Sequence, residues 1–330
     1  MNRARRNLLK TAAGLAALSL LPACRAEAEK TAAHATTANT AAANTGSTAF
    51  HPFDFNKRSV LLNNGIEMPI IGIGMWTLTP EQAANSVSHA LQSGYRLIDT
   101  AKMYRNEEAV GRAVKQSAIA RDQIFITTKI YGSADYANAE NAINERLRLL
   151  GTDYIDLLLL HAPDRHDQEA WQVMERFVQQ GKLRTIGLSN YHRKTFGEIM
   201  QVATIPPAVV QNEVHPYNQD NHTKAFLKNY GTQMEAWYPL GGRNSYGQGG
   251  KDTLFADPVI RAVAETHGKT PAQTILRWQL QAGNIAIPGS SNPAHIRENI
   301  EIFDFELTAD EMAQFAKLDK QRKFSTFGGE

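Results

Sequence analysis

The segment IFITTKIYGSADYANAENAINERLRLLGTDYIDLLLLH, residues 124–161, decides the fold class of this chain. It opens with an apolar, β-branched run at residues 124–129 and closes with a second apolar run at residues 154–161. Between them, residues 139–150 carry apolar positions at helical spacing. Two buried strands joined by a helix are typical of a parallel β-α-β unit.

The same alternation continues on both sides of this segment. Six further short aliphatic runs predict strands at residues 70–74, 96–99, 185–189, 209–214, 233–237 and 284–287. Seven of the gaps between strands carry helical periodicity, for example residues 81–92 and 169–179. Eight strands with intervening helices predict an α/β fold of the closed (β/α)8 TIM-barrel class.

The flanking segments add a hairpin before the barrel and a helix after it. The runs SVLL at 59–62 and IEM at 66–68 flank the turn NNG, whose residues accept the backbone angles of a tight β-turn. Thr308 and Glu311 have capping-box spacing, which predicts a terminal helix outside the barrel. An open dinucleotide-binding sheet is discarded, because Gly72 and Gly74 supply only two glycines of its fingerprint and Thr77 holds the third position.

The composition limits the classes of protein that fit. Of 330 residues, 42% are hydrophobic and one is Cys, so neither disorder nor a disulfide scaffold is expected. The formal net charge of +2 gives no basic field of the kind that holds nucleic acid, which is therefore not expected as a partner. No metal is expected, since no His-Glu-x-x-His pattern or carboxylate–His set marks a strand end.

The first 28 residues are expected to be an export signal. Arg5 and Arg6 precede an apolar run at residues 12–21, which is shorter than the roughly 20 residues of a membrane-spanning helix. The arginine pair resembles a twin-arginine signal, which implies the twin-arginine export machinery as a partner and a periplasmic location. An ordinary secretory signal is the alternative.

Two further expectations concern the residues around this signal. Leu21-Pro22-Ala23-Cys24 resembles a lipoprotein processing box, so Cys24 becomes either a lipid anchor or part of the discarded peptide. In both cases no thiol remains in the folded domain to serve as a nucleophile or a zinc ligand. Residues 29–52 contain mostly Ala, Thr and Asn and predict a flexible linker, followed by the barrel domain at 53–330.

The candidate catalytic residues are those that close the apolar runs, because barrel enzymes place their chemistry at the carboxyl ends of the strands. Asp99, Lys129 and His161 close the second, third and fourth runs, and Tyr104 follows in the loop after Asp99. Each alone could be a turn former, a surface charge, a core residue or a packing residue. An acid, an amine, an imidazole and a phenol converging on one mouth instead indicate a proton-transfer site.

The expected chemistry of this site follows from its charges. A phenol with an ordinary pKa of about 10 is a poor acid near neutrality, and the Lys129 ammonium is expected to lower the pKa of Tyr104 toward the working range. Asp99 is expected to keep Lys129 charged in a partly dry barrel mouth. His161 would donate a hydrogen bond to a carbonyl oxygen and fix its orientation.

At these residues the sequence resembles the aldo-keto reductase superfamily. The resemblance covers about residues 59–305 and rests on GYRLIDTA at 94–101 with Tyr104, FITTK at 125–129 and IDLLLLH at 155–161. It implies a single barrel that reduces aldehydes or ketones to alcohols by hydride transfer from NAD(P)H. Tyr104 would be the proton donor, Lys129 and Asp99 would tune it, and His161 would position the small-molecule carbonyl substrate.

The resemblance also implies the cofactor contacts. Ser189, Asn190 and Gln211 match the partners of the nicotinamide carboxamide, and Trp237 stands where the family stacks a Tyr on the nicotinamide. Leu240 and Asn299 complete the candidate cofactor-binding residues.

The last strand departs from the family pattern. Gly289 and His295 replace a Lys and an Arg that usually bind the NADP 2′-phosphate, which leaves Ser290, the backbone near Asn292 and the following helix start to hold a phosphate. NADPH is the expected cofactor and NADH the alternative.

The sequence indicates less about the substrate than about the reaction. Trp76, His161 and Tyr131 are expected to shape the pocket, the Gly-rich segment 241–250 to cover it, and Ala162 before Pro163 to leave it wide. Two other classes stay open. A redox sensor or partner subunit would bind the cofactor with little catalysis, and a metal-dependent barrel hydrolase would need ligands that the strand ends lack.

Overall fold

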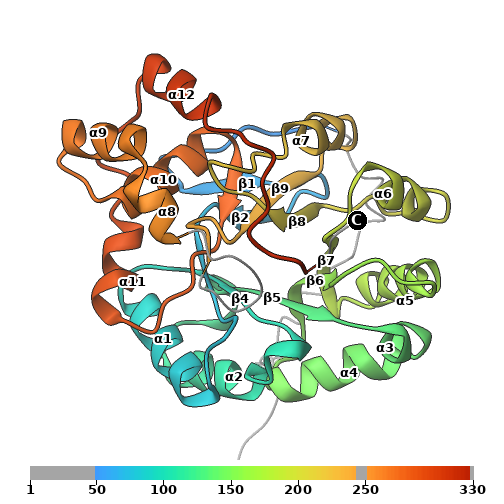
Figure 1. Ribbon diagram of the computed structural model, residues 1–330. Helices are drawn as coiled ribbons and strands as arrows, with labels where there is room; N and C mark the ends of the chain where they lie inside the picture. The colour runs from blue at the N-terminus through green and yellow to red at the C-terminus, as the bar shows by residue number, and fades with distance from the viewer. Residues whose placement is uncertain (1–48, 243–250, 328–330) are drawn as a thin grey trace, which may run out of the picture. The chain divides into compact units, whose positions relative to one another are not determined.

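Eight short parallel strands form the centre of the fold in the computed structural model, which describes residues 49–242 and 251–327 (Figure 1). Each strand pairs with the next along the chain. A parallel bridge between Ile71 and Ala286 and a hydrogen bond from Gly74 N to Pro288 O, at 3.1 Å, join the last strand to the first. The predicted barrel is therefore confirmed. Its strands are β3 Gly72–Gly74, β4 Leu97–Asp99, β5 Phe125–Ile130, β6 Ile155–Leu160, β7 Leu183–Ser189, β8 Val209–Glu213, β9 Gln233–Trp237 and β10 Asn284–Ala286.

The helices surround these strands (Figure 1). The predicted helices at 81–92, 139–150 and 169–179 are confirmed, and two of them begin slightly earlier, at Pro80 and Asp167. Pro is tolerated at the first helical position because its missing N–H would have no partner there. In chain order the helices are α1 Pro80–Gln92, α2 Glu107–Gln116, α3 Ser133–Ala137, α4 Ala139–Leu150, α5 Asp167–Gln179, α6 Arg193–Met200, α7 Asn221–Leu227, α8 Lys251–Ala256, α9 Pro258–His267, α10 Pro271–Gln281, α11 Pro293–Ile300 and α12 Ala309–Ala316.

The predicted hairpin is a separate two-stranded sheet of β1 Ser59–Leu61 and β2 Glu67–Pro69. Asn63 in its turn donates to the carbonyls of Pro207 and Tyr230, both at 3.1 Å, which precede β8 and β9. The hairpin therefore covers the amino-terminal end of the barrel and leaves the carboxyl-terminal end open for a site.

The predicted linker reaches the barrel at its end. His51 O accepts a hydrogen bond of 2.9 Å from Gln233, and the Lys228 ammonium lies over the Phe50 ring. Thus residues 50 and 51, predicted as linker, contact the barrel. The predicted signal peptide, Cys24 and the linker up to residue 48 lie outside the described residues, as do residues 243–250 of the Gly-rich segment.

The C-terminal part of the chain begins outside the barrel and then crosses its mouth (Figure 1). Thr308 and Glu311 form the predicted capping box at the start of α12, and Phe315 of this helix stacks on Trp278 of α10. The following segment, residues 317–327, returns to the carboxyl ends of the strands, where Phe327 contacts the ring of His161. None of the helices among the described residues combines the length and apolarity that a bilayer crossing requires.

Candidate active site

A cavity of about 680 Å³ opens at the carboxyl ends of the barrel strands. All the predicted catalytic and cofactor-binding residues except Lys129 line it, from several different strands and loops, and His295 and Phe327 line it as well. Lys129 lies buried beneath this lining and contacts it through Asp99 and Tyr104. The structure thus gathers the candidates in one place. The lining candidates are Trp76, Asp99, Tyr104, His161, Ser189, Gln211, Trp237, Leu240, Ser290 and Asn299, with Asn190 beside Ser189.

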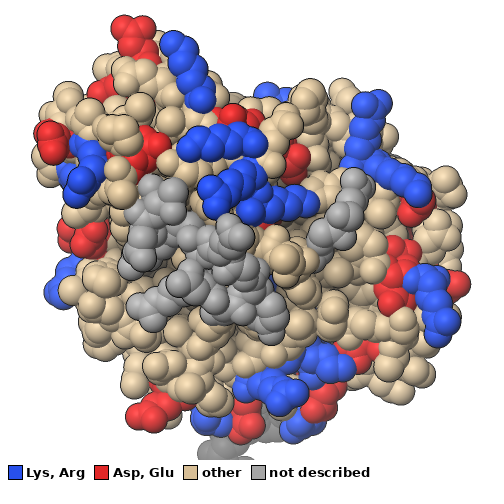
Figure 2. All heavy atoms as spheres, in the orientation of Figure 1, with Lys and Arg blue, Asp and Glu red and all other residues tan. Residues whose placement is uncertain are grey.

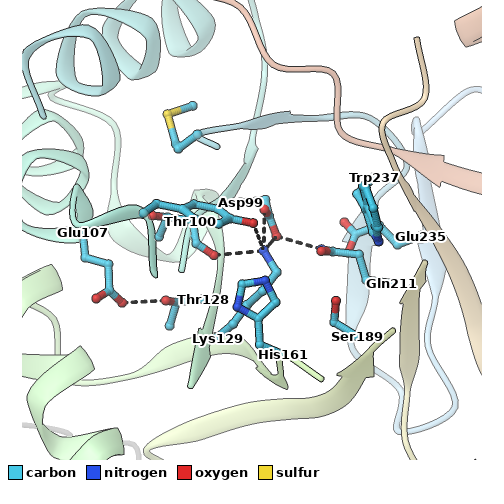
Figure 3. A network of polar contacts seen from close by, with 12 residues as sticks. Asp99, Thr100, Glu107, Thr128, Lys129, His161, Ser189, Gln211, Glu235 and Trp237 are labelled. Atoms are coloured by element: carbon cyan, nitrogen blue, oxygen red, sulfur yellow. Dashed lines mark hydrogen bonds and ion pairs between the residues drawn. The ribbon is translucent and has the colours of Figure 1, made fainter. Parts of the chain in front are cut away.

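Lys129 is the centre of the polar cluster (Figure 3). Its ammonium donates to both oxygens of Asp99, at 2.6 and 2.8 Å, to Thr100 O at 3.1 Å and to the Tyr104 hydroxyl at 3.2 Å. Lys129 is 0% exposed and Asp99 is 2% exposed. A buried ion pair is retained only when further hydrogen bonds satisfy the charged atoms, as they do here.

The charges of this cluster agree with the sequence expectation at Lys129 but not at Tyr104. Burial opposes the charge of Lys129, yet Asp99 and Tyr104 raise its pKa above the ordinary value, so the ammonium stays charged. Burial raises the pKa of Tyr104 to about 12 and outweighs the opposing effect of Lys129. The expectation of a lowered Tyr104 pKa was therefore wrong, because burial destabilises the phenolate more than the Lys129 ammonium stabilises it. Tyr104 holds its proton at neutral pH, as a proton donor must.

His161 is a neutral imidazole on the cavity wall. Burial, and then the charge of Lys129, lower its pKa well below the ordinary value. Its Nδ1 is buried without a hydrogen-bond partner among the described residues. We assign the proton to Nε2, since a buried N–H without an acceptor costs more than an unused acceptor nitrogen. The rings of Tyr104, Tyr131 and Phe327 pack around His161 at centroid distances of 5.8, 5.5 and 5.3 Å.

Gln211 connects the cluster to a second acid that the sequence analysis missed. The Gln211 amide nitrogen donates to Asp99 and to Glu235, each at 2.8 Å. Both hydrogens of the NH₂ group are then used, so the amide carbonyl is the free group that Gln211 can offer to the cavity it lines. Glu235 lies two residues before Trp237 on β9. Side chains alternate along a strand, so this spacing was the available signal that Glu235 also faces the barrel interior.

Asn190, which was predicted to bind the cofactor, also makes several hydrogen bonds to other residues of the protein. Its backbone has a φ of +63°, and its amide donates to His161 O at 2.9 Å and to Ser189 Oγ at 3.1 Å. Its carbonyl accepts a hydrogen bond of 3.2 Å from the Trp237 indole. Asn190 therefore fixes the positions of His161 and Trp237, while the Ser189 hydroxyl and the Trp237 ring face the cavity.

The far end of the cavity lies at the start of α11. Ser290, Ser291, His295, Glu298 and Asn299 line it, and no described lining residue is Lys or Arg. Two predicted phosphate donors are already engaged, because Asn292 N donates to Ser290 Oγ at 3.1 Å and Ala294 N donates to Asn292 Oδ1 at 2.9 Å. These two N–H groups are therefore engaged within the protein, while Ser290 lines the cavity and phosphate binding at this helix start stays a prediction.

The C-terminal segment contributes residues that the sequence analysis did not identify. Glu213 at the end of β8 accepts hydrogen bonds from Phe324 N at 2.5 Å and Ser325 N at 3.2 Å. His215 bonds the same carboxylate at 2.9 Å and stacks on the Phe324 ring at 4.4 Å. This anchor holds Phe327 over His161. No local pattern in the sequence pairs residues so far apart along the chain.

The donor set suits a flat amide-bearing ring rather than a metal. The free Gln211 carbonyl can accept from an amide, the Ser189 hydroxyl can donate, and the Trp237 face can stack, which together fit a nicotinamide. No cluster of three or more metal-ligating acids, His or Cys occurs among the described residues. The fold and cavity thus define a barrel enzyme with a buried proton-transfer cluster.

Comparison with known proteins identifies the family. Residues 70–320 match the Aldo/keto reductase family. The chain is 40% identical over 266 residues to morphine 6-dehydrogenase of Pseudomonas putida. This alignment covers 78% of this chain and 90% of the dehydrogenase. It is 41% identical over 263 residues to methylglyoxal reductase DkgA of Yersinia pestis. This alignment covers 79% of this chain and 92% of the reductase.

Solved structures agree with this result. MGS-M4, an aldo-keto reductase enzyme from a Medee basin deep-sea metagenome library, has a TM-score of 0.78 at 36% identity and covers 82% of this chain and 99% of that chain. An aldo/keto reductase from Brucella melitensis has a TM-score of 0.74 at 38% identity, and the match covers 79% of this chain and 99% of that chain. The chain belongs to the aldo/keto reductase family and is an oxidoreductase that acts on carbonyl compounds.

Proposed function

We propose that this protein reduces aldehydes or ketones with NADPH or NADH at the cluster of Asp99, Tyr104, Lys129 and His161. The observation that carries the proposal is the Lys129 ammonium, which bridges Asp99 and the Tyr104 hydroxyl directly beneath the cavity. A cofactor-binding sensor would not need this bridge, because the cofactor contacts lie on other strands.

The residues divide the chemistry between them. A bound reduced nicotinamide supplies the hydride that goes to the carbonyl carbon. His161 holds the carbonyl oxygen through Nε2–H, and Tyr104 gives its hydroxyl proton to the same oxygen as it gains the electron pair. Lys129 then stabilises the phenolate left on Tyr104, and Asp99 keeps Lys129 charged. Phe327 and Trp76 limit the water that reaches these atoms.

The choice between NADPH and NADH depends on the far end of the cavity. A 2′-phosphate carries charge that Arg or Lys usually pairs, but the described lining offers no Lys or Arg there and includes the acid Glu298. We therefore infer that the protein uses both cofactors, with NADPH held less firmly than in a site with a cation. Restoring the cation with His295→Arg should tighten NADPH by about tenfold or more and leave NADH unchanged. Equal tightening of both would contradict this assignment.

The substrates are proposed to be small carbonyl compounds. Relatives of this chain include a morphine dehydrogenase and a methylglyoxal reductase, which differ greatly in substrate size. Aromatic groups of Trp76, Tyr131 and Phe327 line the cavity beside His161, which favours aromatic or aliphatic aldehydes over highly polar ones.

A periplasmic location is proposed from Arg5 and Arg6 and the apolar run that follows them. Fractionation of cells should place the wild-type protein in the periplasm and retain the Arg5→Lys/Arg6→Lys variant in the cytoplasm. A membrane-bound fraction that Cys24→Ala releases would show that the lipid anchor forms. An unchanged distribution of the arginine variant would contradict export by the twin-arginine machinery.

The proposed function is tested by single-turnover oxidation of bound NADPH and NADH with a panel of aromatic aldehydes and methylglyoxal. Wild-type protein should oxidise the cofactor, and Tyr104→Phe should slow this step by about 10²- to 10⁴-fold with cofactor affinity unchanged. Tyr230→Phe makes the same chemical change in an aromatic cluster with Phe196 and Phe226 and should react normally. Tight cofactor binding without turnover on any carbonyl would favour the sensor or partner-subunit function instead.

A further inference from the structure

Glu235 is a second buried acid beside the proposed catalytic cluster. It lies in the middle of β9, is 0% exposed, and is labelled in Figure 3 next to Gln211 and Trp237. Neither the proton transfer nor the substrate contacts described above use this side chain. Its position one hydrogen bond away from Gln211 nevertheless connects it to the cavity wall.

The hydrogen bonds around Glu235 offer a negative charge only one donor among the described residues, and that donor is neutral. Its Oε2 accepts one bond from the neutral Gln211 amide, at 2.8 Å. Its Oε1 is buried without a hydrogen-bond partner among the described residues. The Lys129 ammonium spends its donors on Asp99, Thr100 and Tyr104. An ionised carboxylate with one neutral donor and an unpaired buried oxygen is strongly unfavourable.

Asp99 and Glu235 compete for the same stabilisation, and Asp99 has more of it. Asp99 accepts three bonds, two of them from the ammonium, whereas Glu235 accepts one. Two carboxylates on either side of one amide NH₂ repel each other, so the pair holds a single proton at neutral pH. The geometry puts that proton on the acid with fewer donors.

We propose that Glu235 is a positioning residue that carries a proton at neutral pH. In this state it accepts the second N–H of Gln211, turns the Gln211 carbonyl toward the cavity, and leaves Asp99 as the only anion paired with Lys129. The neutral acid thereby orients the amide acceptor for the nicotinamide without adding a charge beneath it.

The other influences on Glu235 either raise its pKa further or lower it too weakly to remove the proton at neutral pH. Burial, and then the charge of Asp99, raise the pKa of Glu235 to about 8, while Gln211 and the more distant Lys129 oppose the shift. Tyr104, the remaining titratable group that interacts with it, is uncharged below its own pKa of about 12.

Loss of this proton should change the balance between the two forms of the cofactor, a consequence that rests on the proposed function. The oxidised nicotinamide ring is a cation and the reduced ring is neutral, so a new negative charge next to Gln211 favours the oxidised form. An ionised Glu235 also raises the pKa of Tyr104 and makes it a weaker acid. Above a pH of about 8 the protein should therefore bind oxidised cofactor relatively better and reduce carbonyls more slowly.

The proton itself is tested without cofactor or turnover. Infrared difference spectra between about pH 6.5 and about pH 9.5 should show the carbonyl stretch of a protonated carboxylic acid that disappears on the basic side. The band should shift in protein labelled with carboxyl-carbon-13 glutamate and stay in place with labelled aspartate. The component of this band with a midpoint near pH 8 should be absent from Glu235→Gln, which keeps only the smaller component of Glu107, whose pKa burial raises to about 6. The same component should be unchanged in Glu265→Gln, which alters an exposed acid on α9. The labelled wild type answers the question even if Glu235→Gln does not fold.

The consequence is tested by the ratio of the dissociation constants of reduced and oxidised cofactor over the same pH range. In the wild type this ratio should rise at least about threefold across pH 8, and in Glu235→Gln it should stay flat. A band that follows labelled aspartate, or no band at all, would overturn the proposal. A pH-dependent ratio in Glu235→Gln would do the same. Failure of the proposed function would be recognised separately, as normal infrared results in a protein that binds no nicotinamide cofactor.

Discussion

Lys129 holds the polar cluster together through four contacts, although it is buried more completely than a lysine usually is. Two of these contacts neutralise Asp99, and one reaches the hydroxyl of Tyr104. The same side chain therefore has a structural role toward Asp99 and a chemical role toward Tyr104, and the two roles can be separated by mutation.

Removing the ammonium should destabilise the protein as well as inactivate it. In Lys129→Met, Asp99 is left as an uncompensated buried acid, which should lower the free energy of unfolding by about 3–5 kcal/mol. The double variant Asp99→Asn/Lys129→Met removes both charges and should recover much of this loss while remaining inactive. Urea denaturation of the three proteins measures the effect. Equal stability of the single and double variants would show that Asp99 does not depend on Lys129.

Glu235 should make stability depend on pH. Its folded-state pKa of about 8 exceeds its ordinary value of 4.5, so the folded state binds the proton more tightly than the unfolded state does. The stabilising effect of the proton is complete below about pH 4.5 and is lost as pH rises through about 8, by roughly 5 kcal/mol in all. The difference in unfolding free energy between Glu235→Gln and wild type should therefore grow from about pH 5 to about pH 8. A constant difference would contradict a raised pKa.

The sequence was sufficient to predict which residues form much of the site, but not the environment of each residue. The types and strand-end positions of Asp99, Lys129 and His161 were sufficient to group them, because barrel strands converge at one end. Their environments were not, because burial is a property of the packed molecule. For this reason the pKa of Tyr104 was expected to fall and instead rises, and Glu235 was not selected at all.

Among the elements, the C-terminal segment adds Ser325 and Phe327 to the cavity wall from beyond the last barrel strand. Glu213 and His215 hold Phe324 and Ser325, and this places Phe327 against His161 and Tyr131. Segments of this kind can change substrate range without changing the catalytic strands.

Truncating this contact should change substrate binding more than catalysis. Phe327→Ala should raise KM for aromatic aldehydes by about 5- to 30-fold, which corresponds to losing roughly 1–2 kcal/mol of apolar contact, and should leave single-turnover chemistry with methylglyoxal nearly unchanged. Phe303→Ala truncates a ring that lies under Arg58, away from the cavity, and serves as the control. An equal loss of kcat with both substrates would mean that Phe327 instead orders the catalytic residues.

Secondary elements were predicted well in number and less well in extent. The strand predicted at 70–74 is only three residues long in the sheet, Gly72–Gly74, and Ile71 contributes a single bridge that closes the barrel. Apolar periodicity identifies a strand but not where its pairing stops. The path of residues 317–327 was not predicted, because their anchor is a carboxylate about 110 residues earlier in the chain.

At the scale of the whole molecule, a small net charge conceals a local positive region. Figure 2 shows Lys and Arg side chains gathered over the path that the C-terminal segment takes in Figure 1. Lys320, Arg322 and Lys323 of this segment are exposed. A dinucleotide carries at least two phosphate charges, so a positive rim should attract it during the approach.

This rim should accelerate cofactor association. Replacing Lys320, Arg322 and Lys323 by Ala should lower the association rate constant by about three- to tenfold at low salt, and the difference should shrink at high salt. Dissociation rates should change little, since these side chains lie outside the cavity lining. Stopped-flow quenching of tryptophan fluorescence measures both rates. A variant that differs only in its dissociation rate would show direct contact rather than long-range attraction.

The central claim is that a carbonyl receives a hydride in the cavity and a proton from Tyr104, and isotope transfer tests it most directly. Wild-type protein should be incubated with an aldehyde and with NADPH or NADH deuterated at C4 of the nicotinamide, and the alcohol analysed by mass spectrometry. We expect one deuterium on the alcohol carbon, formed at a rate that Tyr104→Phe lowers by about 10²- to 10⁴-fold. Alcohol without deuterium, or formed equally fast by Tyr104→Phe, would contradict the account.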